Sequence, residues 1–386
     1  KANEKILYNK FTLYDSIIWM SFYDFFNLMG EFPILILCLI LIISVVFVNG
    51  WTDAPNAIAT CISTKSIRPK NALIMAAICN LLGVMAAFFF MNEVSETISN
   101  IVVFSNASPI SALTALSASM LGVTAWGVFS WIFGIPSSES HSLIGGLTGA
   151  GLACMTLKMN VIIPFGPTSS WAMVLYGLFG SIIFGFFGGL GFTKLIELIF
   201  KRANRNHTRK FFKWAQITSG GCLAFAHGAQ DGLKFVGIFL MAIEFASQAH
   251  NLSSSNQIII SHDIAPLWWV AVIVAIVIAI GTCVGGFRII KKIGQGLSKM
   301  EPYQGFCSDL TSGVGILLAT YCGLPISTGQ VATSSILGVG ATRGIKKVKW
   351  NAFLEMVITW ICCFPSTILV GYLFTLLLLN IPGLGG

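Results

Sequence analysis

The segment Gly134-Ile-Pro-Ser-Ser-Glu-Ser-His141 has a counterpart later in the chain, Gly323-Leu-Pro-Ile-Ser-Thr-Gly-Gln330. In both, a Gly-x-Pro sequence is expected to end one helix, because proline lacks a backbone N–H. Hydroxyl residues follow the proline and can cap the next helix. Stretches rich in small residues come after both copies. This recurrence predicts one structural unit that occurs twice.

A second, weaker pair of segments precedes each copy. Asn49-Gly-Trp-Thr-Asp-Ala-Pro-Asn56 precedes the first and His227-Gly-Ala-Gln-Asp-Gly-Leu-Lys234 precedes the second, so that Asp53 aligns with Asp231. The order and approximate spacing of the motifs are the same in both halves. We therefore expect four regions. They are an N-terminal interfacial segment (1–32), a first repeat (33–200), a basic cytoplasmic linker (201–213) and a second repeat (214–386).

The composition indicates a membrane protein. Of 386 residues, 55% are hydrophobic and 10% are charged, whereas soluble proteins are about 25% charged. The apolar runs are continuous rather than alternating, which favours α-helices over a β-barrel. The fold class is therefore an all-α polytopic membrane protein with about 10 to 12 membrane segments. Ten crossings are predicted: 33–64, 71–91, 110–133, 136–157, 171–200, 213–241, 266–286, 304–323, 325–341 and 350–379.

The basic residues orient these crossings. Most of the 23 Lys and Arg residues fall in alternate connections, at 65–70, 194–213, 287–303 and 342–349. Cytoplasmic loops are enriched in Lys and Arg, so both termini are expected outside the cell membrane. This placement also explains the net charge of +8, so the charge does not indicate a nucleic-acid partner. Residues 11–29 are expected to form an interfacial helix. The cysteines show no metal-type pairing, so we expect them to be reduced residues of the core.

With this orientation, the two Asp-containing spans run in opposite directions, and so do the two Pro-Ser segments. Inverted repeats are a common plan of secondary transporters, in which discontinuous helices meet at the substrate near the midplane. Each Asp span is long and has Gly or Pro beside the aspartate, so both are expected to be broken helices.

Asp53 and Asp231 are the strongest functional candidates, because a carboxylate inside the membrane is unfavourable unless it is paired or hydrated. They could bind Na⁺ together with backbone carbonyl oxygens, or carry a proton. Asn56 and Gln230 could add amide groups to this site or only satisfy broken backbone. The alternative is that the aspartates lie at helix ends and are simply solvated.

The Pro-Ser segments suggest an anion site. A helix N-terminus offers free N–H groups and a positive dipole end, which suit phosphate or sulfate. Lys234, three residues after Asp231, would add a fixed positive charge, unless it only forms a local ion pair. Ordinary helix capping is the alternative for the hydroxyls. The residues expected to bind the substrate are Asp53, Ser137, Ser138, Ser140, Gln230, Asp231, Lys234, Ser327 and Thr328.

Four further polar residues lie in or near apolar spans. Glu139 either faces solvent or binds the coupling cation, since it would repel an anion. His141 is either a packing histidine or a proton carrier. Asn80 and Asp309 could act in gating or support the site, or have a purely structural role.

These motifs resemble the inorganic phosphate transporter (PiT) family, in its bacterial form, through most of residues 45–379. Thr52, Asp53 and Asn56 are similar to the family's first Gly-Ala-Asn-Asp motif, and the segment from Gly228 to Asp231 is similar to the second. This chain departs from the family in two ways. Thr52 and Gln230 replace Asn in the two Asp motifs, and Gly329-Gln330 replaces Thr-His at the end of the second Pro-Ser segment. The resemblance implies symport of inorganic phosphate, alone or as a metal complex, with H⁺ or Na⁺.

The expected function is therefore a symporter that imports inorganic phosphate across the cell membrane, with no cofactor, no resident metal and no enzymatic activity. A homodimer is one arrangement we consider. The alternatives are a sulfate or other oxyanion permease of the same fold, a passive anion channel, and an intramembrane aspartyl protease that uses Asp53 and Asp231 as its dyad.

Overall fold

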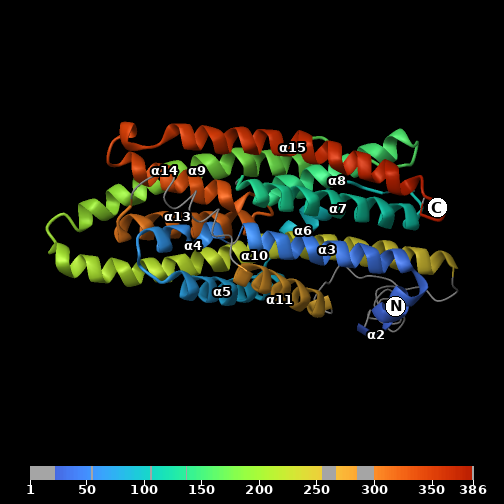
Figure 1. Ribbon diagram of the computed structural model, residues 1–386, viewed down its shortest axis with the longest axis horizontal. Helices are drawn as coiled ribbons and strands as arrows, with labels where there is room; N and C mark the ends of the chain where they lie inside the picture. The colour runs from blue at the N-terminus through green and yellow to red at the C-terminus, as the bar shows by residue number, and fades with distance from the viewer. Residues whose placement is uncertain are drawn as a thin grey trace, which may run out of the picture.

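The computed structural model describes residues 22–53, 55–104, 107–135, 137–253, 267–284 and 300–384. Most of its helices run along one long axis and pack side by side, as Figure 1 shows. In chain order the elements are α2 (Phe22–Glu31), α3 (Pro33–Thr52), α4 (Pro55–Ser63), α5 (Pro69–Phe90), α6 (Glu93–Ser99), α7 (Pro109–Phe133), α8 (Glu139–Thr156), α9 (Ser170–Ile199), α10 (Arg205–Ser253), α11 (Trp268–Val284), α13 (Pro302–Tyr321), α14 (Thr328–Ala341), the 3₁₀ turn η2 (Ile345–Lys347) and α15 (Trp350–Leu379).

The chain is an all-α polytopic membrane protein. Six helical stretches of the described residues are long and apolar enough to cross a bilayer: Pro33–Ser63, Pro69–Phe90, Pro109–Phe133, Ser170–Ile199, His207–Asn251 and Trp350–Leu379. The helix α11 is apolar but shorter. With 14 residues, α14 is about 21 Å long and cannot cross a core of about 30 Å alone. The predicted crossing 325–341 is therefore a helix that starts inside the protein.

The first Asp span is broken, as predicted. α3 ends at Thr52 and α4 begins at Pro55. Proline removes one helical hydrogen bond and disfavours helical geometry in the residue before it, so the chain opens at this point. Asp53 is the C-cap of α3, with its N–H donated to the Asn49 carbonyl at 2.8 Å. The break leaves a carboxylate at the junction of two short buried helices.

The prediction that the second Asp span is also broken is wrong. α10 is one helix of 49 residues that passes through Asp231 without interruption. The span contains Gly228 and Gly232 but no proline, and glycine alone does not remove a hydrogen bond. Gly228 instead allows α5 to pack closely, because a Cβ there would collide with the Asn80 backbone. α10 also extends back to Arg205, so most of the predicted basic linker 201–213 is helical.

The two halves are packed into each other rather than side by side. α8 packs against α15 and α14 against α9, while α5 packs along α10 and α11 along α3. Each of these pairs thus joins a helix of one half to a helix of the other. Figure 1 shows that α3 and α4 run from right to left and that α10 runs from left to right.

The ends of the bundle differ in their loops. α2 and the end of α15 lie at one end of the molecule, while the α9–α10 and α14–α15 connections lie at the other (Figure 1). α2 packs on the bundle through Phe25, whose ring centroid lies 4.7 Å from that of Trp269. Residues 11–21 of the predicted interfacial helix lie outside the described residues. All ten cysteines are free, but Cys222, Cys283, Cys322 and Cys362 are exposed rather than in the core.

Candidate functional site

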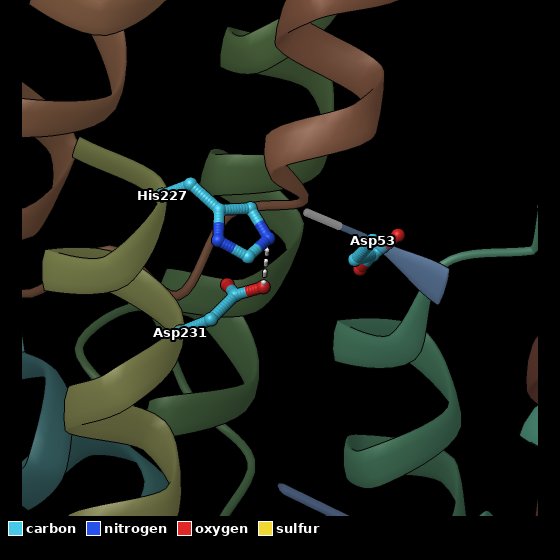
Figure 2. A group of neighbouring side chains, drawn as sticks. All are labelled: Asp53, His227 and Asp231. Atoms are coloured by element: carbon cyan, nitrogen blue, oxygen red, sulfur yellow. Dashed lines mark ion pairs between the residues drawn. The ribbon is translucent and has the colours of Figure 1, made fainter. Parts of the chain in front are cut away.

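Two aspartates and a histidine meet between α10 and the α3–α4 break. Donor atoms of Asp53, His227 and Asp231 all lie within 4.8 Å of one another, and all three residues are buried. Figure 2 shows His227 and Asp231 on α10 with Asp53 across from them, and the line that joins the His227 ring to the Asp231 carboxylate. That Nε2–Oδ2 distance is 3.3 Å, but neither ring nitrogen has hydrogen-bond geometry to a partner among the described residues.

Amide and ammonium groups hold the two carboxylates. Asn56 Nδ2 donates to Asp53 Oδ1 at 3.2 Å, and Lys234 Nζ donates to Asp231 Oδ1 at 2.7 Å. In the aligned motifs Asn56 and Lys234 occupy the same position, three residues after the aspartate. Asn49 on α3 donates to Asp231 Oδ2 at 3.0 Å and so links the two halves.

Lys234 lies at the centre of the site. Its Nζ donates to Asp231, to Ser140 Oγ at 2.5 Å and to the Ile326 carbonyl at 2.6 Å. The whole side chain is buried. Its three N–H donors therefore have three acceptors, from α10, from the first turn of α8 and from the segment just before α14. One ammonium group thus joins the second Asp motif to both Pro-Ser segments.

The two Pro-Ser segments have the same backbone shape. Gly134 and Gly323 both adopt positive φ, +62° and +67°, a left-handed conformation that glycine adopts without strain. The next residue in each segment donates its N–H five residues back, from Ile135 to Ser130 O and from Leu324 to Ala319 O. Each preceding helix therefore ends in the same way, and the chain turns into α8 or α14.

The beginnings of α8 and α14 touch through one pair of serines. Ser138 is the N-cap of α8, where its Oγ accepts from the His141 N–H at 3.3 Å, and the same hydroxyl donates to Ser327 Oγ at 2.9 Å. Ser327 is the N-cap of α14 without a side-chain capping bond. Ser137 lies before the cap, and Thr328 is the first residue of α14 with its hydroxyl unpartnered. The helix starts are thus brought together as predicted, but only Ser138 makes the predicted side-chain cap.

Glu139 is buried, so the interpretation that it faces solvent is wrong. The Thr52 hydroxyl lies 3.3 Å from its Oε1, while its Oε2 has no hydrogen-bond partner among the described residues. Gly127 on α7 leaves room for this carboxyl group, since a Cβ there would lie 3.0 Å from Oε1. Glu139 is therefore a third carboxyl group next to the first Asp motif.

Four other predicted residues have side-chain contacts of their own. The Gln230 side chain bridges the Leu324 carbonyl and the Thr320 hydroxyl. His141 stacks on Phe364 with ring centroids 4.5 Å apart, the packing role that was considered. Asn80 donates to Thr282 Oγ1 at 3.0 Å, which joins α5 to α11. Asp309 lies apart from the cluster. Its carboxylate accepts a hydrogen bond from Thr60 Oγ1 at 2.6 Å, and Thr60 lies one turn after Asn56 on α4.

Sequence reasoning missed Asn49 and His227. Both lie four residues before an aspartate and at the same position in the aligned motifs, so each shares a helix face with its aspartate. This spacing was a usable signal. What it could not show is that Asn49 donates to the aspartate of the other half.

The site carries an excess of acidic groups. Asp53, Asp231 and Glu139 are opposed by one ammonium group, that of Lys234, and all four side chains are buried. Buried charges are stable only when they are paired or hydrogen-bonded. The side-chain oxygens of the site that lack partners among the described residues include Asn49 Oδ1, Asn56 Oδ1 and one carboxylate oxygen of Glu139. Oxygen atoms with free lone pairs around an acidic cluster are suitable ligands for a cation.

The chain matches known proteins over most of its length. Residues 49–371 match the model of the Phosphate transporter family. A Bacillus subtilis protein named "Probable low-affinity inorganic phosphate transporter" is 34% identical, over 88% of this chain and 96% of its own length. A protein of Rhizobium meliloti with the same name is 31% identical, over 89% and 96%.

One solved structure has a similar fold. It is described as "The sodium-dependent phosphate transporter" and matches with a TM-score of 0.70 and 21% sequence identity. The match covers 91% of this chain and 100% of that one. At this identity the likeness concerns the fold.

Proposed function

This chain belongs to the phosphate transporter family, and on that premise we propose that it is a secondary transporter that imports inorganic phosphate together with a coupling cation. The observation that carries the proposal is one buried cluster that contains both Asp motifs and both helix starts. The family is one of transporters, and the chain is not an enzyme.

The two halves of the chain, 33–200 and 214–386, are proposed to be inverted repeats. The opposite directions of α3 and α10 support this (Figure 1), and so does the exchange of packing partners between equivalent helices. The matching backbone of the segments at Gly134 and Gly323 supports it at the atomic level. In such a plan the substrate binds where the repeats meet, and one group of helices moves against the other.

Phosphate is proposed to bind at the starts of α8 and α14. These helix ends provide backbone N–H groups and positive dipole ends, and Ser138, Ser140 and Ser327 provide hydroxyls. Lys234 provides a full positive charge and is already within hydrogen-bond distance of Ser140. To bind, the anion would replace the hydrogen bond between Ser138 and Ser327. It would also replace the Ile326 carbonyl as an acceptor of Lys234 Nζ. Because these groups are buried, the helix starts must part before phosphate can enter.

The coupling cation is proposed to bind near Asp53. In the second motif, Lys234 supplies a cation that is part of the chain and that satisfies Asp231. The first motif has Asn56 at the equivalent position, so Asp53 and Glu139 have no fixed cation of their own. Na⁺ or H⁺ at these carboxyl groups would balance the charge of the anion. The oxygens of Asn49 and Asn56 would complete the ligands of Na⁺.

A phosphate complexed with a divalent metal is a second form of cargo that this site suits. Two carboxylates and an imidazole within 4.8 Å are common ligands of divalent transition metals. Asp53, His227 and Asp231 would then hold the metal of the cargo, while the helix starts hold its phosphate.

Uptake of labelled phosphate by purified protein in liposomes tests the proposal. We expect uptake driven by an inward H⁺ or Na⁺ gradient, with sulfate a weak competitor. Adding EDTA separates the two forms of cargo, since it stops uptake of a metal complex but not of free phosphate. Uptake that is equally fast without any cation gradient would instead indicate a passive channel.

A further inference from the structure

A basic cavity lies apart from the transport site, where the turn between α4 and α5 meets the first part of α10. Its volume is about 450 Å³, and Lys65, Arg68 and Lys213 line it together with Ser66. Its described lining contains no acidic residue. None of the three basic side chains forms an ion pair with a carboxylate in the described part of the chain. Three positive charges from two elements therefore surround one space.

Hydrogen bonds fix the turn against α10. Gln216 Oε1 accepts from Ser66 Oγ at 2.6 Å and from Thr64 Oγ1 at 2.8 Å. Gln216 lies three residues after Lys213, so the two share a face of α10. The contact that holds the turn in place therefore also keeps Lys213 beside Lys65 and Arg68.

The backbone at this turn also favours an anion. α5 begins at Pro69, and its N-cap residue Arg68 makes no side-chain capping bond, so first-turn N–H groups of α5 stay open at its positive end. Lys65 has a positive φ of 58°, a conformation that strains a residue other than glycine.

The surroundings indicate a membrane lipid as the source of that anion. Next to Lys213 on α10, Phe211 and Trp214 are 57% and 70% exposed, as is typical of aromatic residues at a membrane interface. From the N-terminus of α5 an exposed apolar stripe continues through Ile74, Ile78 and Leu82. A headgroup in the cavity would thus have its acyl chains along α5.

We propose that Lys65, Arg68 and Lys213 bind the phosphate of an anionic phospholipid headgroup. Basic pockets on the cytoplasmic side of membrane helices are suited to such headgroups. The site would tie the α4–α5 turn and α10 to the inner leaflet. It does not depend on the transport activity proposed above.

Lipid binding to the detergent-purified, delipidated protein tests this, with phosphatidylglycerol and phosphatidylcholine as probes in native mass spectrometry. Each Lys or Arg near an anionic surface contributes about fivefold in affinity. The variant Lys65→Gln/Arg68→Gln/Lys213→Gln should therefore bind phosphatidylglycerol on the order of 100-fold more weakly. Binding of phosphatidylcholine should stay the same.

The matched control is Lys201→Gln/Arg202→Gln/Lys346→Gln, which removes two lysines and one arginine that are exposed elsewhere. It should retain its affinity for phosphatidylglycerol, and an equal loss in both triple variants would overturn the proposal. So would full retention in the cavity variant. Displacement of the lipid by excess inorganic phosphate would assign the cavity to a soluble anion and overturn the lipid as its ligand.

A single variant guards against a trivial loss of folding. Lys65→Gly removes one charge and relieves the positive φ, so its midpoint of thermal unfolding without lipid should rise. Its affinity for phosphatidylglycerol should nevertheless fall about fivefold. Unchanged affinity in this more stable protein would contradict the role of Lys65.

Discussion

Lys234 is the residue that most distinguishes the two Asp motifs. Its ammonium group contacts Asp231, Ser140 and the Ile326 carbonyl, whereas the neutral amide of Asn56 at the equivalent position donates to Asp53. The second motif thus contains its own cation, and the first motif does not. This difference is the basis of our expectation that one coupling cation binds near Asp53.

The charge of Lys234 can be tested by stability. Lys234→Gln leaves Asp231 buried without its cation, and breaking such a pair destabilises a protein by about 3–5 kcal/mol. Lys234→Gln/Asp231→Asn removes both charges and should unfold at a higher temperature than the single variant. Thermal unfolding in detergent measures both. A double variant less stable than Lys234→Gln would contradict the buried pair.

Asp53 can be tested by the cation dependence of uptake. Asp53→Asn keeps the size of the side chain but removes its negative charge, so most of the gradient-driven phosphate uptake should be lost, as expected for an intramembrane carboxylate that binds the driving ion. Glu96→Gln, which changes an exposed carboxylate on α6, is the control and should behave as wild type. Normal gradient dependence in Asp53→Asn would remove Asp53 from the coupling mechanism.

At the scale of elements, the sequence predicted helices better than it predicted their interruptions. Pro55 correctly indicated the break between α3 and α4, where its missing N–H removes a helical hydrogen bond, although Pro365 lies inside α15 without ending that helix. Gly232, beside Asp231, was misread as a break in α10. A Cβ at Gly232 or Gly228 would collide with α5, so these glycines allow α5 to approach, which only the packed structure reveals. The sequence also did not reveal that α14 is too short to cross the membrane. A short buried helix and a membrane-spanning helix are both apolar, so composition does not distinguish them.

The break before Pro55 should be essential for transport but not for folding. Pro55→Ala restores the N–H and permits one continuous helix, which would move Asp53 away from Asp231. We expect little loss of thermal stability and a loss of uptake of more than tenfold, comparable to other misplacements of reacting groups. Pro109→Ala, at the first turn of α7, is the matched control. Wild-type uptake by Pro55→Ala would show that the break has no function.

The approach of α5 to α10 can be tested at Gly228. Gly228→Ala places a Cβ against the Asn80 backbone, and such overpacking destabilises by about 1–3 kcal/mol. Gly180→Ala on α9, where a Cβ meets nothing within 4 Å, should be neutral or slightly stabilising. Thermal unfolding of the two variants compares them directly. Equal stability would mean that α5 and α10 are less tightly packed than described.

At the scale of the whole molecule, the repeat explains which parts of the site could be predicted. The hydroxyl and Asp motifs were recognisable because each occurs twice, and their meeting was expected from the proposed inverted repeats. The contacts between halves, such as Asn49 with Asp231 and Ser138 with Ser327, could not be predicted, since nothing local in the chain specifies them. Asp309 has no recognised counterpart, and its separation from the cluster was equally hidden.

The orientation that we expect for the bundle in the membrane rests on its basic connections. The basic α9–α10 and α14–α15 connections lie opposite the end where α15 finishes (Figure 1), and basic loops stay in the cytoplasm. In a bacterial host, alkaline phosphatase fused after Gly386 should be active and a fused green fluorescent protein dark. The reverse pattern would invert the topology.

The most direct test of the account is a reversible cross-link between the two helix starts. Ser138→Cys/Ser327→Cys replaces the two hydroxyls that lie 2.9 Å apart, in a Cys363→Ala background because the Cys363 thiol is 3.6 Å from the Ser138 carbonyl. Oxidation should form a disulfide that stops phosphate uptake, reduction should restore uptake, and bound phosphate should slow the cross-linking. A disulfide that never forms, or a cross-linked protein that transports phosphate at the full rate, would contradict a shared site between the two halves.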